Sequence, residues 1–69
     1  MNRLILAKDI YAKYAVEKAI YDFSEVSQID LFEDDFNFIC VFNSLKYDTD
    51  VTIKEFENYV IDVSFQMVK

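Results

Sequence analysis

The sequence has no histidine, glycine, proline or tryptophan, and only one cysteine among its 69 residues. Without histidine it has no Ser-His or Cys-His nucleophile pair and no imidazole metal ligand. Without glycine it has no phosphate-binding loop of the P-loop or dinucleotide type. A single cysteine, Cys40, excludes an internal disulfide and a thiolate zinc site within one chain. We therefore expect a protein that is not an enzyme and that has no cofactor or metal site.

Basic residues are also few, since seven Lys and Arg face thirteen Asp and Glu, giving a net charge of −6. The basic residues are scattered, which argues against nucleic acid and against anionic membrane surfaces. No apolar run approaches the ~20 residues of a membrane span, and the apolar part of the N-terminal segment is too short for a signal peptide. We expect a cytoplasmic protein, which suits a lone reduced thiol.

Hydrophobic residues are plentiful, at 54% of the chain with 17% aromatic. This composition predicts one folded domain over residues 1–69. A domain of this length buries only about 60% of the surface that its unfolded chain exposes, so its core cannot hide all of these side chains. The surplus predicts a protein or peptide partner, or a second copy of the chain.

Three short segments have the composition of strands. Residues 3–7 (RLILA) read as the first strand, residues 28–33 (QIDLFE) alternate as the second, and residues 36–43 (FNFICVFN) form the third. Between the last two, Glu33, Asp34 and Asp35 predict a charged hairpin turn, for which the alternative reading is a site for a hard cation. We favour the solvated turn, because Ca²⁺ needs six or more oxygens in a defined loop.

Two segments have helical periodicity. From about residue 12, apolar residues recur three and four apart (Ala12, Ala15, Val16, Ala19, Ile20 and Phe23), with Asp9 as a candidate cap. A second helix is expected over residues 53–67, after a capping box made by Thr52 and Glu55. Its core-facing residues would be Ile53, Phe56, Val60, Val63 and Met67.

The third strand is apolar on both faces, which is typical of a central strand. Its residues Phe36, Phe38, Cys40 and Phe42 share one face, and Ile39 and Val41 share the other. The order β-α-β-β-α predicts a two-layer α+β domain, with a small mixed three-stranded sheet and two helices on one face. The opposite face of the sheet would then be bare in a monomer.

The candidate partner-binding residues lie on three surfaces. The last helix has a second apolar stripe, the first helix has two tyrosines on its polar face, and the sheet has its uncovered side. The alternative readings are closure over an end of the core for the stripe and ordinary half-exposed positions for the tyrosines. The residues are Ile61, Phe65 and Val68, then Tyr14 and Tyr21, then Ile39 and Val41. For Cys40, mid-strand and without a base, we expect an inert core thiol.

Three pieces of the sequence stand out, namely Tyr11, AIYDF at residues 19–23, and EFENYVID at residues 55–62. Together they resemble HxsD of the His-Xaa-Ser peptide-modification systems. Phe56, Asn58 and Asp62 stand where that family has Phe-x-Asn and a later Asp. The chain departs from the family further on, where Gln66 replaces an expected Arg.

The resemblance implies a small accessory protein encoded with radical SAM enzymes that modify ribosomally made peptides. The Fe–S cluster and S-adenosylmethionine would belong to the enzyme, and this chain would hold the precursor peptide, the enzyme, or both. An edge strand, at residues 3–7 or 28–33, would accept an extended peptide by strand addition. The alternative is a self-assembling structural homodimer with no dedicated ligand, formed by the bare sheet faces.

Overall fold

The computed structural model describes residues 2–67, and the side chains of residues 2–65. Its elements are β1 (Arg3–Ala7), α1 (Lys13–Asp22), β2 (Gln28–Glu33), β3 (Asn37–Asn43) and α2 (Thr49–Met67). This is the predicted β-α-β-β-α order, and the α+β class is confirmed.

The sheet has the order β1-β3-β2, which confirms that the most apolar strand is central. Both pairings are antiparallel, so the expectation of a mixed sheet is wrong. The reason lies in the connections. The crossover through α1 leaves β1 and β2 pointing the same way, but they are not neighbours. The tight hairpin after β2 sends β3 back between them, antiparallel to both.

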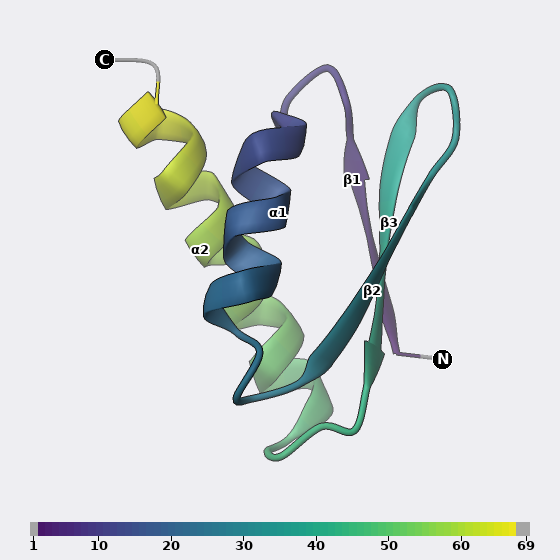
Figure 1. Cartoon of the computed structure of the whole chain (residues 1–69), viewed down its shortest axis with the longest axis vertical. Coiled ribbons are helices and arrows are strands. Elements are labelled where there is room, and N and C mark those ends of the chain that lie inside the picture. Colours follow the sequence, from purple (N-terminus) through teal and green to yellow (C-terminus); the bar gives the residue numbers. More distant parts are fainter. Residues whose placement is uncertain (1, 68–69) are drawn as a thin grey trace.

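The two helices cover one face of the sheet, as predicted, and run in opposite directions (Figure 1). α1 contacts β2, whereas α2 contacts β1, so each helix accompanies one edge of the sheet. In the described part of the chain, neither helix combines the length and apolar character that crossing a membrane requires.

The core lies between the sheet and the helices, and Phe56 of α2 is at its centre. Its ring is fully buried and meets the rings of Phe23 and Phe42 edge to face, with centroids 5.3 and 5.2 Å apart. Such pairs add to the free energy gained by burying apolar area. The buried apolar residues are Leu6, Ala15, Val16, Ala19, Ile29, Phe38, Cys40, Phe42, Phe56, Val60 and Val63.

The start of α2 and the predicted caps of both helices differ from the sequence-based expectation, whereas α1 starts where it was expected. α2 begins at Thr49, four residues early, because the Asp48 carboxylate accepts the backbone N–H of Val51 at 3.1 Å. The capping box is therefore wrong, and Thr52 is buried inside the helix. Asp9 does not cap α1, whose N-cap is Ala12 without a side-chain hydrogen bond.

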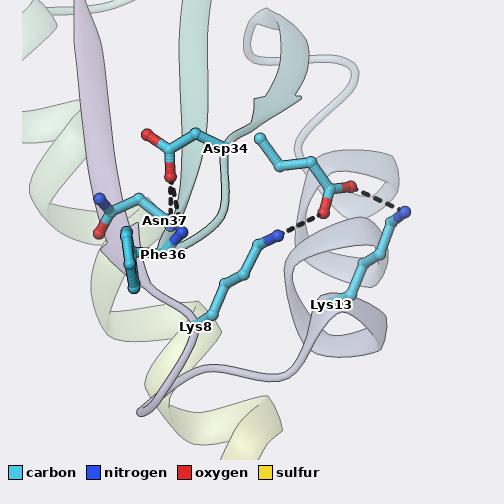
Figure 2. Close-up of polar contacts among 6 residues, drawn as sticks. Lys8, Lys13, Asp34, Phe36 and Asn37 are labelled. Atoms are coloured by element: carbon cyan, nitrogen blue, oxygen red, sulfur yellow. Dashed lines mark hydrogen bonds and ion pairs between the residues drawn. The ribbon is translucent and has the colours of Figure 1, made fainter.

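The β2–β3 hairpin turn is held by Asp34, which confirms the predicted turn. Its Oδ1 accepts the backbone N–H groups of Phe36 and Asn37 at 2.8 and 2.7 Å (Figure 2). These bonds place Phe36 in the turn and start β3 at Asn37. Phe36 was expected on the strand, on the face shared with Phe38, but its side chain is 77% exposed.

Replacing Phe38 by Asp should abolish cooperative folding, because Phe38 is 4% exposed and a carboxylate there has no partner. The cost exceeds the few kcal/mol that stabilise a domain of this size (about 3–5 kcal/mol). The matched control is Phe32→Asp in the adjacent strand, where the side chain is 56% exposed. Thermal unfolding followed by circular dichroism at low protein concentration should show a transition for the control alone. Equal loss of structure in both variants would contradict the assignment of inner and outer faces.

Candidate docking surfaces

β1 is an edge strand of the sheet, and its outer backbone groups pair with no other strand that the structure describes. In an antiparallel pair, the backbone N–H and C=O groups of successive residues point alternately toward the neighbouring strand and away from it. The Asn2 carbonyl accepts the N–H of Phe42 at 2.7 Å, so the even-numbered residues face β3. The backbone groups of Arg3, Ile5 and Ala7 therefore point away from the sheet. Among the described residues, only the Ala7 carbonyl is engaged, by the turn that follows.

β2 is the second open edge. The N–H of Asp34 donates to the Asn37 carbonyl at 3.0 Å, and this register turns the backbone groups of Ile29, Leu31 and Glu33 outward. Their side chains face the helices, whereas those of the outward residues of β1 lie on the other side of the sheet. The two edges thus offer the same kind of hydrogen bonds with different side chains around them.

A shallow hollow of about 740 Å³ lies between the start of β1 and α2. Its wall carries charges of both signs, since Arg3, Lys54, Asp50 and Glu57 are among its lining residues. A smaller hollow of about 520 Å³ lies between β2 and α1, and its lining has one acidic residue, Glu17, among neutral polar and apolar residues. The larger hollow is lined by Asn2, Arg3, Thr49, Asp50, Val51, Ile53, Lys54 and Glu57.

The second apolar stripe of the last helix is split by the fold. Phe65 is 69% exposed, whereas Ile61 is half-buried. Ile61 lies four and eight residues after Glu57 and Ile53, so it shares their side of α2, next to β1. Val68 lies outside the described residues. The use of this stripe in binding stays a prediction.

Tyr14 and Tyr21 are 62% and 78% exposed on the face of α1 opposite the core. Tyr21 lines the smaller hollow with Ile20 and Ile29, beside the β2 edge. The two tyrosines therefore do not lie with the Ile61 side of α2, which accompanies the other edge. Their role in binding also stays a prediction.

The outer sheet face has a row of three apolar side chains, one from each strand. Ile39 lies between Ile5 and Phe32, which are 55% and 56% exposed. The next row places Val41 between Arg3 and Asp30. Ile39 and Val41 are half-buried because these neighbours cover them.

Ile5 and Phe32 were missed as candidate residues. Their alternation with Leu4, Leu6 and Leu31 was visible in the sequence. Only the pairing with β3 shows that they flank Ile39 on one surface.

Glu33 ties the ends of β1 and β2 to the start of α1. Its two carboxylate oxygens pair with Lys8 at 2.8 Å and Lys13 at 2.9 Å (Figure 2). Hydrogen bonds from these lysines, first from Lys8, lower the pKa of Glu33 from 4.5 to about 2. The same contact raises the pKa of Lys13. Glu33 and Asp34 of the acidic turn are thus engaged by lysines and by backbone N–H groups, and no cluster of three metal-ligating side chains occurs among the described residues.

Asp22 joins the two helices on their outer side. Its carboxylate accepts hydrogen bonds from the Tyr59 hydroxyl of α2 and from Lys18, the latter at 3.0 Å. The Tyr59 bond first, and then the Lys18 bond, lower the pKa of Asp22, and the pKa of Tyr59 rises in return. The ring of Tyr59 also packs on Phe23, with centroids 5.6 Å apart.

Cys40 is fully buried on the helix-covered face of β3. Burial raises the pKa of its thiol from 9.0 to about 11. A thiol with this pKa carries almost no thiolate at neutral pH, and the thiolate is the reactive form. Cys40 is therefore an inert part of the core, as expected from the sequence.

The family model of the His-Xaa-Ser system protein HxsD matches residues 6–66. The chain belongs to the HxsD family. HxsD membership indicates an accessory role in a His-Xaa-Ser system. Searches of curated proteins and of solved structures each found no match.

The segments that carry the HxsD resemblance meet in the structure. AIYDF supplies Asp22 and Phe23 at the end of α1, and EFENYVID supplies Phe56 and Tyr59 in α2. Tyr11 packs against the edge of the same core. These residues hold the helices to each other and to the sheet. Phe23, Phe56 and Tyr59 are therefore structural, whereas Tyr21 and Ile61, in the same two segments, belong to the candidate docking residues.

Acid should weaken the fold through Glu33. Its folded-state pKa lies below its ordinary value, so its contribution to stability is complete above about pH 4.5 and disappears as the pH falls toward 2. Glu33→Gln should lower the free energy of unfolding at neutral pH and should reduce the loss on acidification. Urea titrations at several pH values measure both effects. The control is Asp35→Asn in the same turn, since Asp35 forms no ion pair with a described residue. Parallel pH curves for Glu33→Gln and the wild type would contradict this account.

Proposed function

We propose that this chain is a non-catalytic accessory domain that binds an extended segment of a partner along the open edge of β1. The partner is the precursor peptide of its His-Xaa-Ser system, its radical SAM enzyme, or both. The observation that carries the proposal is the set of outward backbone groups at Arg3 and Ile5, beside a hollow formed with α2. Membership of the HxsD family supports the accessory role.

β1 suits this task better than β2. Its hollow is larger, and its mixture of basic and acidic side chains can pair with polar groups of either sign. The far end of β2 is already engaged, because Glu33 is bound by one lysine from the β1 turn and one from α1. Near the start of β1 the hollow leaves room for the side chains of an added strand that point toward α2.

Strand addition gives affinity through the main chain and specificity through alternate side chains. Each backbone hydrogen bond contributes about 0.5–1.5 kcal/mol net. On the outer side of the sheet, side chains of the added strand would lie beside Ile5 and extend its apolar row. The net charge of −6 favours a basic partner and raises the rate of encounter more than the affinity.

The exposed part of α2 is the second contact in this proposal. Phe65 points away from the core and would dock the enzyme together with Ile61 and Val68. Tyr14 and Tyr21 offer amphipathic rings on the neighbouring helix, a residue type enriched in protein interfaces. A peptide at the start of the β1 edge leaves Phe65 and the two tyrosines free, whereas Ile61 borders its hollow, so one domain has room for a peptide and an enzyme.

Co-expression with the radical SAM enzyme and the precursor peptide of a His-Xaa-Ser system should yield a complex at physiological salt. The β1 edge can then be tested in a chemically synthesised chain, made by ligating two peptides at Cys40. This chain carries an N-methyl group on the backbone nitrogen of Ile5. This change removes an outward N–H and keeps every side chain. We expect the affinity for the peptide to fall by roughly tenfold or more, because one or two hydrogen bonds are lost and the methyl group clashes with the added strand.

The matched control has the N-methyl group on Leu31, whose N–H points outward from β2. It should leave titrations of the peptide unchanged. A loss confined to the Leu31 chain would move the site to the other edge. Purification of the chain alone, without either gene product, would refute the proposal as a whole.

Phe65→Asp should weaken association with the radical SAM enzyme without unfolding the domain, because Phe65 is 69% exposed. The proposal makes Phe65 an anchor of the contact, and loss of such a hot-spot side chain costs about 2 kcal/mol or more, so we expect a decrease in affinity of at least roughly tenfold. Affinity is measured by calorimetry and folding by circular dichroism. Unfolding of this variant would place Phe65 in the core, and unchanged affinity would remove it from the interface.

A further inference from the structure

The outer face of the sheet is chemically self-complementary. Its apolar row joins Ile5, Ile39 and Phe32, and the adjacent row has Arg3 on one edge and Asp30 on the other. Arg3 forms no ion pair with any residue that the structure describes. The surface therefore has an apolar centre with one positive and one negative edge at the same height along the strands.

We propose that two copies of this chain associate through this face, around a two-fold axis parallel to the strands. Stacked sheets pack about 10 Å apart with roughly aligned strands. The axis places β1 of each copy over β2 of the other. Ile39 then meets the partner's Ile39, and Ile5 meets the partner's Phe32. Arg3 faces the partner's Asp30, and this ion pair occurs twice.

The charges select this axis over the perpendicular one. A two-fold axis across the strands, through the Ile39 row, would place the row of Arg3 against the row of Ala7 and Asn37. Both charges would then lack an opposite charge. The carboxylate of Asp30 is also held in place, because one of its oxygens accepts the Asn43 side-chain N–H at 2.7 Å. Its second oxygen remains for the partner's Arg3.

The size of the face limits the affinity. Three strands spaced ~4.8 Å apart and five residues of ~3.4 Å each define a face of roughly 14 by 17 Å. Stable complexes bury about 800 Å² per partner, which is more than this face provides. We therefore expect a concentration-dependent dimer with a dissociation constant of roughly 10 µM to 1 mM. The backbone edge of β1 and α2 stay open in this dimer. Arg3 also lines the hollow beside β1, so the dimer is tested with the isolated chain, and its failure leaves the proposed function untouched.

The test uses Arg3→Asp and Asp30→Arg, two exposed substitutions, in sedimentation equilibrium. Each substitution gives residues 3 and 30 the same charge, and these residues face each other at both symmetric contacts of the homodimer. Each substitution should therefore raise the dissociation constant of the homodimer by roughly tenfold. The net charge changes from −6 to −8 in the first and to −4 in the second. An effect of net charge alone would change the dissociation constants of the two variants in opposite directions. Loss of the ion pairs raises both dissociation constants.

Mixing the two variants provides the decisive measurement. In the mixed dimer both contacts again oppose an acid to a base, so the heterodimer should form more tightly than either homodimer. Nuclear magnetic resonance spectra of the wild type should show dilution shifts confined to the outer face, at Ile5, Phe32 and Ile39, with Phe65 unaffected. A wild type that is monomeric at about 1 mM, or a mixture no tighter than its components, would overturn the proposal.

Discussion

The insertion of β3 between two strands of the same direction is the constraint on which the molecule depends. The apolar side chains of β3 lie on both faces of the sheet and need to be buried on both. The two helices bury them on one face only. There, Phe38, Cys40 and Phe42 are buried under Phe56 and its neighbours. On the other side Ile39 and Val41 receive partial cover from the flanking strands. The surplus of apolar residues in the composition thus becomes a defined surface with a defined register.

Polar contacts fasten the ends of this arrangement. Glu33 and two lysines close one end, where the β1 turn, the hairpin and α1 meet. Asp22 and Tyr59 join the helices at their outer side. Lys8, Lys13 and Lys18, three of the seven basic side chains, therefore form ion pairs within the molecule. Much of the acidic excess is left at the surface, where it favours basic partners.

The segments that carry the HxsD resemblance contain core residues as well as candidate docking residues. Phe23 and Phe56, one from each segment, meet edge to face between α1 and α2. Such residues specify the fold rather than a ligand. The β1 edge owes its availability to backbone geometry, which places few demands on side chains. A family signature that is structural and a function carried by backbone and shape are consistent with each other.

The sequence by itself determined the number, type and order of the elements, the central strand and the inertness of Cys40. Those properties follow from local periodicity and from the absence of residue types. It did not determine the antiparallel sheet, the cap at Asp48 or the exposed position of Phe36. These depend on hydrogen bonds whose partners only the folded chain selects. The outward groups of Arg3 and Ile5, and the row that joins Ile5, Ile39 and Phe32, were decided by tertiary structure alone. They arise from the register between strands distant in sequence, and a shift of one residue would reverse every face.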